Sequence, residues 1–296
     1  MIEVSGLTQT YRGGKGVFDL DFSIAKGEVF GYLGPNGAGK TTTIRNLLGF
    51  TNASAGTARI NGLDCRKEAT DLQRIIGYLP GEIAFLDYMT GAGFLDFMCE
   101  LRGTKDRSRR IELVDRFELE TAGKIKRMSK GMKQKLAIVT AFMHDPEVYI
   151  LDEPTSGLDP FMQNIFMDLV DEERSRGKTI MMSSHLFEEV QRSCSRAGII
   201  REGRIVAIED IDSLNAMKQK TYTITLAEQA VADRIIDGTL EAKRISPTRV
   251  EITVGSDYRG FFKELSAHNV VGLYAQAQSL EDVFMKYYGR NGGKNE

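Results

Sequence analysis

The chain has 296 residues, of which 42% are hydrophobic, and 39 basic residues nearly balance 41 acidic ones for a formal net charge of −2. That length suits one large domain or two of ordinary size, and the balanced charge offers no bulk electrostatic footprint for nucleic acid. No uncharged apolar run approaches the ~20 residues that cross a bilayer, and the start, MIEVSGLTQTY, has no apolar signal-peptide core, so we expect a chain that is neither secreted nor membrane-spanning.

The first 33 residues predict short strands, because apolar and polar positions alternate in IEVSGL, VFDLDFSI and GEVFGYL and Gly-rich breaks separate these segments. The last strand leads directly into GPNGAGKT, residues 34–41, and the helix-like segment TTTIRNLLG follows. Two glycines separated by four residues and followed by Lys and Thr match the phosphate-binding loop pattern, here in its required setting between a strand and a helix.

Each residue type in this loop has a mechanical reason. Glycines let backbone N–H groups turn towards phosphate oxygens, the following helix adds its positive N-terminus, Lys40 reaches the terminal phosphates, and Thr41 offers a hydroxyl to Mg²⁺. The predicted cradle consists of Gly34, Pro35, Asn36, Gly37, Ala38, Gly39, Lys40, Thr41 and Thr42. By itself such a loop fits a kinase, a GTPase or a motor as well as any other nucleotide-binding protein.

Beyond the loop, TARINGLD predicts a hairpin that turns at Asn-Gly, and RIIGYLP predicts a short strand stopped by Pro80 and Gly81. Apolar residues then recur at helical spacing, most clearly in FLDFMCEL and RRIELVDRF, which predicts an α-helical insertion at about residues 82–135. Strands and helices alternate again from EVYILDEP to AGIIREGRIVAIED. This rhythm predicts an α/β fold with a mixed, mostly parallel sheet and helices packed on it.

A second pattern begins after a polar helical stretch at residues 211–220. TYTITL, RVEITV and VVGLYAQ predict strands, and AEQAVADRIID, YRGFFKELSAH and LEDVFMKYYG predict helices. Such a run makes a small α+β domain. We therefore divide the chain into residues 1–212 and 213–296, and expect the second part to have a regulatory or dimerisation role.

The segment VYILDEP carries the next chemical signal, because it places Asp152 and Glu153 at the carboxyl end of a buried strand, where open α/β sheets bind ligands. Asp152 is suited to hold Mg²⁺, and Glu153 to polarise an attacking water. In isolation, two acids after an apolar run more often mark a strand that ends in a solvated turn. Downstream of a phosphate loop the functional interpretation is favoured.

Together with the phosphate loop, the stretch RMSKGMKQKLAIVTAFMHDPEVYILDEPTSGLDP resembles the ATP-binding cassette (ABC) family, over roughly residues 1–210. MSKGMKQKL looks like the family's signature motif, with Ser129 and Gly131 at the matching positions, and SGLD resembles its D-loop, which ends at Asp159. The resemblance implies a P-loop NTPase that binds ATP and Mg²⁺. It also implies that the signature completes the site of a second copy, so that two chains sandwich two ATP molecules.

Two further residues gain a role from the resemblance. SSHLFEEV carries His185 where the family has a histidine that senses the γ-phosphate, although a histidine at a strand end is more often structural. Tyr11 precedes the phosphate loop by about the distance at which the family has an aromatic residue that stacks on adenine. A purely structural role for Tyr11 in a turn is equally compatible with the sequence. The predicted catalytic residues are therefore Glu153 and His185, and the predicted metal ligands are Thr41, Asp152 and Glu82.

Glu82 marks a departure from the family pattern. After the strand IIGYLP the family usually has a glutamine that touches Mg²⁺ and the water, whereas this chain has Gly81 followed by Glu82. Either Glu82 supplies a carboxylate instead or that contact is missing, and we expect Glu82 to face the site. In the family the next segment borders a groove for the membrane partner, so we expect partner contact around Phe85 to Tyr88.

The tail SLEDVFMKYYG resembles ATP-binding subunits of bacterial multidrug, antibiotic and sodium exporters, whose permease is a separate polypeptide. The predicted function is ATP hydrolysis that powers such a permease, with the chain cytoplasmic and peripheral on the inner face of the membrane. The alternatives are a nucleotide-dependent sensor that hydrolyses weakly and an ABC ATPase that moves no solute. The balanced charge gives no reason to expect a nucleic-acid partner. No metal beyond Mg²⁺ is expected either, because Cys65, Cys99 and Cys194 lie far apart in the sequence and are predicted to be buried thiols.

Overall fold

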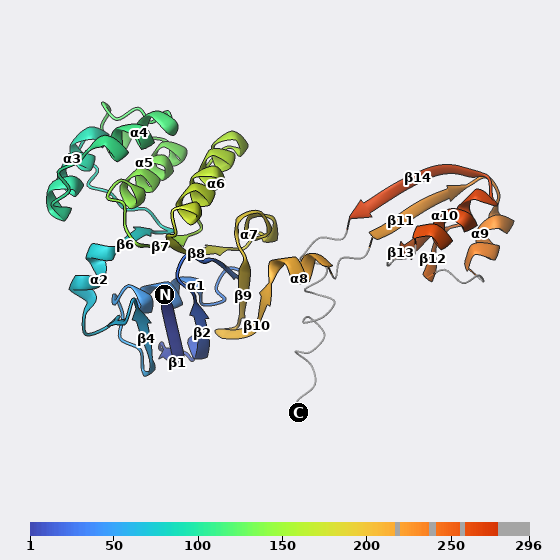
Figure 1. Ribbon diagram of the computed structural model, residues 1–296, viewed down its shortest axis with the longest axis horizontal. Helices are drawn as coiled ribbons and strands as arrows, with labels where there is room; N and C mark the ends of the chain where they lie inside the picture. The colour runs from blue at the N-terminus through green and yellow to red at the C-terminus, as the bar shows by residue number, and fades with distance from the viewer. Residues whose placement is uncertain (217–219, 237–240, 255–257, 278–296) are drawn as a thin grey trace. The chain divides into compact units, whose positions relative to one another are not determined.

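Figure 1 shows the computed structural model, which describes residues 1–216, 220–236, 241–254 and 258–277. The chain divides into two compact units, Met1–Ile211 and Asp212–Glu296. Within the described ranges, no helix is both long and apolar enough to cross a membrane.

The first unit begins with a four-stranded antiparallel sheet in the order β2-β1-β4-β5. Its strands are β1 (Ile2–Thr10), β2 (Gly16–Ile24), β4 (Ala55–Ile60) and β5 (Leu63–Asp64). The hairpin predicted in TARINGLD joins β4 to β5, and Asn61 and Gly62 at its turn both have positive φ, 50° and 83°. An Asn-Gly turn of this kind twists in the same sense as the strands it connects.

A six-stranded sheet forms the centre of the first unit, in the order β10-β9-β3-β8-β7-β6. The strands are β3 (Val29–Leu33), β6 (Ile76–Leu79), β7 (Val148–Asp152), β8 (Thr179–Ser184), β9 (Arg196–Arg201) and β10 (Arg204–Asp210). All neighbours are parallel except β10, which runs antiparallel to β9. Every residue of β3, β7 and β8 is buried, as expected for strands covered on both faces. The predicted α/β class with a mixed sheet is confirmed.

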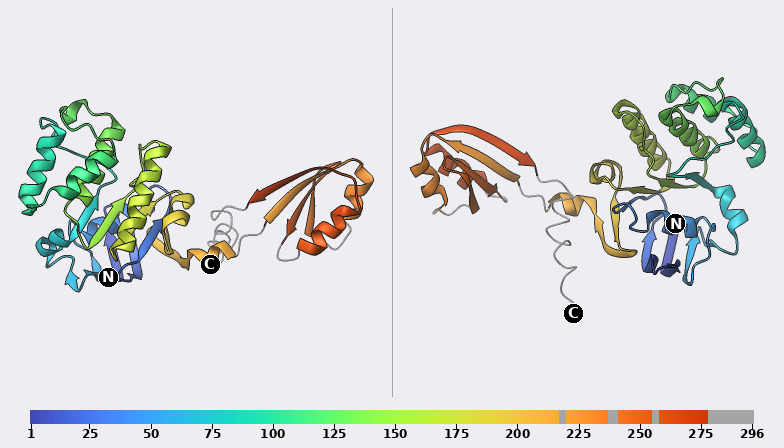
Figure 2. Two further views of the ribbon diagram at one scale, coloured as in Figure 1. Left: turned by 45° about the horizontal axis from the view of Figure 1, so that its top comes forward. Right: turned by 180° about the vertical axis from the view of Figure 1, so that it is seen from behind.

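Helices cover this sheet on both sides. They are α1 (Lys40–Leu47), α2 (Ala69–Ile75), α3 (Gly91–Arg102), α4 (Ser108–Arg116), α5 (Lys130–Phe142), α6 (Pro160–Ser175) and α7 (Phe187–Ser193). Figure 2 shows α3, α4, α5 and α6 gathered on one side of the central sheet, with α1 and the antiparallel sheet on the other. At Gly31 of β3 an added Cβ would lie 2.4 Å from Val190 Cγ1, so α7 rests directly on the strand backbone.

The second unit contains an antiparallel sheet in the order β12-β13-β11-β14, after the short helix α8 (Ile211–Ala216). Its strands and helices are β11 (Lys220–Leu226), α9 (Gln229–Ile236), β12 (Glu241–Ser246), β13 (Arg249–Val254), α10 (Tyr258–Ser266) and β14 (Val270–Ala277). Residues of α9 and α10, among them Ile235 and Phe261, form one core with Ile224 and Ile252 of the sheet. The predicted tail helix, LEDVFMKYYG, lies outside the described residues.

Candidate active site

The loop after β3 turns tightly into α1. Gly34 donates its N–H to the carbonyl oxygen of Ser184 at 3.2 Å, which ties the start of the loop to the end of β8. Gly39 has φ 113°, and a Cβ there would lie 2.7 Å from Val17 Cγ1. A side chain at this position would meet both backbone strain and a clash, so glycine is required. The loop therefore holds its backbone against β8 and β2.

Lys40 opens α1 with its side chain folded back over the loop. Its ammonium donates to the carbonyl oxygens of Gly34 at 2.6 Å and Pro35 at 3.3 Å, and lies 3.4 Å from Glu153 Oε1. Only 5% of the residue is exposed. A buried ammonium held by carbonyls and one carboxylate can exchange these partners for phosphate oxygens of a nucleotide in the cradle.

Asp152 ends β7 beside the loop helix and is almost fully buried. The Thr41 hydroxyl donates to Asp152 Oδ2 at 2.9 Å, and Ser183, its register partner on β8, donates to Oδ1. Two strand ends and one helix start thus converge on a single carboxylate. A carboxylate beside a threonine hydroxyl is an oxygen donor set of the kind that Mg²⁺ prefers, so these residues fit the predicted ion.

Glu153 follows in a left-handed conformation, with φ 48°. Its N–H donates to the backbone carbonyl and to the hydroxyl of Ser183, at 3.2 and 3.1 Å, which holds the turn in place. Its Oε1 atom lies 3.4 Å from both Lys40 Nζ and His185 Nδ1. The structure therefore brings the predicted acid, lysine and histidine together at the mouth of the phosphate loop.

A cleft of about 390 Å³ opens beside these groups. Its lining consists of Thr41, Arg45, Tyr78, Pro80, Gly81, Glu82, Asp152 and Glu153. Glu82 thus lines this cleft, and its role as a metal ligand stays a prediction. A Cβ at Gly81 would lie 3.2 Å from Asp152 Oδ2, so the glycine leaves open the space beside the aspartate that a side chain would fill.

Our sequence reasoning missed Arg45 and Tyr78 in this cleft. Arg45 follows Thr41 by four residues, which places both on the same face of a helix and would have been a usable signal. Tyr78 belongs to a short apolar strand with no polar pattern, and burial raises the pKa of its hydroxyl to about 12.

The signature segment begins α5. Ser129 caps the helix by accepting the N–H of Met132 at 3.2 Å, and the buried Gln134 donates to the carbonyl of Pro154 at 2.6 Å. At Gly131 a Cβ would lie only 3.0 Å from the carbonyl oxygen of Gly157. The helix start is thereby fastened to the segment that follows Glu153. Within the described part of the chain, neither Ser129 nor Gly131 makes a hydrogen bond to the phosphate loop.

The remaining predicted residues lie outside the cleft. Asp159 caps α6 by accepting the N–H of Met162 at 2.9 Å. Tyr11 lies in the turn between β1 and β2 with its ring partly exposed. In the expected partner segment, Phe85 packs edge-on against Phe94 of α3, whereas Leu86 and Tyr88 are exposed. The roles of all these residues stay predictions.

Known proteins similar to this chain are ATP-binding proteins of ABC transporters. The family model described as ABC transporter matches residues 17–156. The bacitracin transport ATP-binding protein BcrA of Bacillus licheniformis is 32% identical over 303 residues, with 98% of this chain and 97% of the relative covered. The daunorubicin/doxorubicin resistance ATP-binding protein DrrA of Streptomyces peucetius is 32% identical, with 97% and 92% covered. A solved ATP-binding subunit of an ABC transporter matches with TM-score 0.68 and 29% identity, over 73% of this chain and 92% of its own.

Proposed function

This chain belongs to the ABC transporter family as an ATP-binding subunit with ATPase activity, and we propose that it drives an exporter whose membrane-embedded permease is a separate polypeptide. The proposal rests on one observation at the mouth of the phosphate loop: Lys40 Nζ and His185 Nδ1 each lie 3.4 Å from Glu153 Oε1. Export is supported by relatives that share nearly the whole chain length and are named for bacitracin transport and for daunorubicin/doxorubicin resistance.

In the proposed reaction the phosphates of ATP lie in the loop, and Lys40 exchanges the carbonyls of Gly34 and Pro35 for phosphate oxygens. Glu153, released from Lys40, accepts a hydrogen bond from the attacking water and orients it. His185 donates to the γ-phosphate, and the loop N–H groups stabilise the charge that develops there. Catalysis of this kind is mostly positioning and electrostatics. Mg²⁺, held by Thr41 and Asp152, with Glu82 facing it, would neutralise phosphate charge.

The proposal includes a second copy of the chain. Ser129 and the first N–H groups of α5 form a positive helix start, which suits a phosphate. Since their own loop already has donors of this kind, we infer that they complete the nucleotide site of the other copy. Closing on ATP and reopening after hydrolysis would then drive the permease, through contacts at exposed Leu86 and Tyr88. The chain would lie on the cytoplasmic face of the membrane, held by the permease.

The test is Glu153→Gln, which keeps the size of the side chain and removes its charge. We expect ATP binding to persist, turnover to fall at least about 100-fold, and an ATP-dependent dimer to accumulate in size-exclusion chromatography. Glu120 is an exposed acid that does not line the cleft, so Glu120→Gln is the matched control and should behave as wild type. Turnover at the wild-type rate in Glu153→Gln would refute the role of Glu153. Copurification of an integral membrane protein with the tagged wild-type chain tests the exporter assignment.

A further inference from the structure

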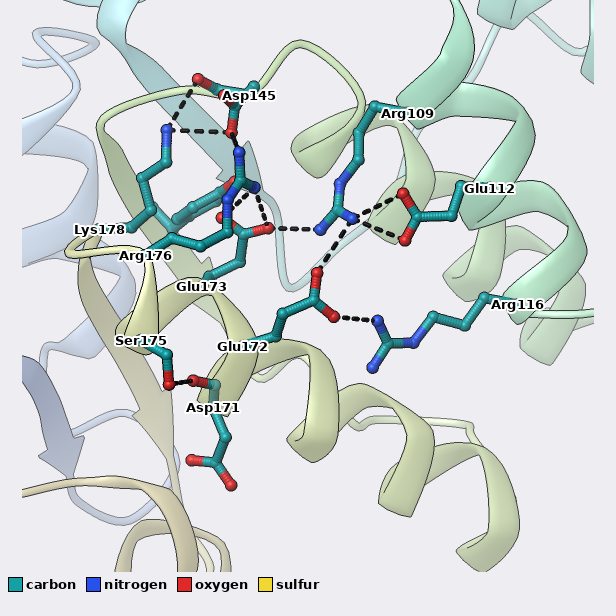
Figure 3. Close-up of polar contacts among 11 residues, drawn as sticks. Arg109, Glu112, Arg116, Asp145, Asp171, Glu172, Glu173, Ser175, Arg176 and Lys178 are labelled. Atoms are coloured by element: carbon teal, nitrogen blue, oxygen red, sulfur yellow. Dashed lines mark hydrogen bonds and ion pairs between the residues drawn. The ribbon is translucent and has the colours of Figure 1, made fainter.

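A cluster of charged side chains joins α4 of the helical insertion to α6, the helix that begins at Asp159 (Figure 3). From α4, Arg109 reaches across to α6, where it meets Glu172 at 3.1 Å and also binds Glu173. Two turns further along α4, Arg116 binds Glu172 at 2.6 Å. The helical insertion is thus tied to the α/β core by Arg109 and Arg116.

The inner part of the cluster is buried. Glu173 is fully inaccessible to solvent and also binds Arg176 at 2.9 Å and accepts the hydroxyl hydrogen bond of Tyr149 at 3.2 Å. The Arg109 side chain is mostly covered, and its Nε has no hydrogen-bond partner within the described residues. Buried ion pairs generally add little net stability, because desolvation offsets their attraction. What the forked guanidinium does supply is a defined geometry between the two helices.

The cluster lies far from the N-terminal starts of α5 and α6. α5, on which α4 packs, begins at Ser129, and α6 begins with its cap at Asp159. The start of α5 already lies close to the segment that leads into α6, since a Cβ at Gly131 would lie 3.0 Å from the carbonyl oxygen of Gly157. Residues 172 and 173 lie about 20 Å further along α6, at 1.5 Å per residue. Contacts at two separated points fix the angle between packed elements, whereas one contact leaves it free.

We propose that Arg109, Glu172 and Glu173 are positioning residues that set the angle of the insertion and its signature helix α5 relative to α6. Ser129 and Asp159 of one chain would thereby be presented together to the nucleotide site of the second copy. The inference rests on the proposed ATP-dependent dimer and adds residues that the family motifs do not include. It predicts that the cluster controls dimer closure without changing ATP binding to a single chain.

The experiment uses the full-length Glu153→Gln chain as parent, in which ATP-dependent dimers accumulate. Dimer dissociation constants are measured with saturating ATP by analytical ultracentrifugation, and ATP affinity of the single chain by calorimetry at low protein concentration. Adding Arg109→Gln should weaken the dimer about 10-fold and leave ATP affinity within about twofold, since coupling of this kind is typically on the order of a tenfold effect. The dimer dissociation constant of the double variant, Arg109→Gln with Glu172→Gln, should be no higher than that of Arg109→Gln alone.

Glu112→Gln is the matched control. Glu112 binds the same guanidinium at 2.7 Å, but it lies on α4 and does not bridge to α6. The dimer of this variant should match that of the parent. Arg109→Lys, which keeps charge without the fork, should restore only part of the affinity. Equal dimer affinity in Arg109→Gln and the parent would overturn the inference, as would a parallel loss of ATP affinity and melting temperature. A parent that forms no dimer with ATP would instead overturn the proposed function on which the inference rests.

Discussion

His144 should make the first unit sensitive to acid above the range in which carboxylates titrate. The imidazole follows α5, with Nε2 3.2 Å from the carbonyl oxygen of Ile76 and Nδ1 buried without a partner within the described residues. Burial, helped by the nearby Arg102 charge, lowers its pKa from the ordinary 6.5 to about 4. The folded chain therefore keeps this histidine neutral under conditions in which the unfolded chain protonates it.

The sign and size of the effect follow from this difference. Because the folded pKa is depressed, the contribution of His144 is fully present above pH 6.5 and is lost as pH falls towards 4. One pH unit corresponds to about 1.4 kcal/mol, so at pH 5 the unfolded state gains about 2 kcal/mol relative to pH 7.5. For a unit of roughly 200 residues, this corresponds to about 4–8 °C in melting temperature.

The assay compares wild type with His144→Gln, which can still hydrogen bond to the carbonyl of Ile76 but does not titrate. Both chains share every carboxylate, so the difference between their stabilities isolates the histidine. Thermal melting at pH 7.5, 6 and 5 should show wild type losing about 2 kcal/mol more than the variant on acidification. A wild-type to variant difference that stays constant over this range would show that the imidazole is not held neutral by the fold.

Two further predictions concern the candidate active site. Ser183→Ala removes one of the two hydroxyl donors to Asp152 and one acceptor of the Glu153 N–H. The variant should lose about 1.5–3 kcal/mol of stability in melting experiments and have lower ATP turnover, and wild-type values for both would contradict the arrangement described. Glu82→Ala should lower ATP turnover and raise the Mg²⁺ concentration needed for half-maximal rate, since this carboxylate lines the cleft beside Asp152. Unchanged values in a Mg²⁺ titration would leave Glu82 no part in the site.

The central sheet could be predicted from the sequence because strands buried on both faces are continuous apolar runs, as in VYIL before Asp152. Strand β12, by contrast, was missed. Its sequence, EAKRIS, contains three charged residues and no alternation, and it forms because it pairs with β13, with Arg244 opposite Val250. Helix α2 was likewise not predicted. In both cases tertiary context outweighs the local pattern.

The site was predictable where chemistry is local in sequence, and not where it depends on the fold. The phosphate loop and the Asp152–Glu153 pair are short motifs with fixed spacing. Ser183 acts on Asp152 from 31 residues away, and Arg109 reaches Glu172 across 63 residues. An ordinary serine or arginine carries no local sign of such a contact, so only the packing of β8 beside β7, and of α4 beside α6, reveals it.

The three cysteines have a practical consequence for studying this protein. Cys65, Cys99 and Cys194 are all buried, and burial raises the pKa of the Cys65 thiol to about 12. Because the thiolate is the reactive species, native cysteines of this kind should resist maleimide labelling at neutral pH. A fluorophore could then be directed to one introduced surface thiol, such as Glu120→Cys, in the otherwise native chain. Single-molecule recordings of subunit association could use the protein with its natural core untouched.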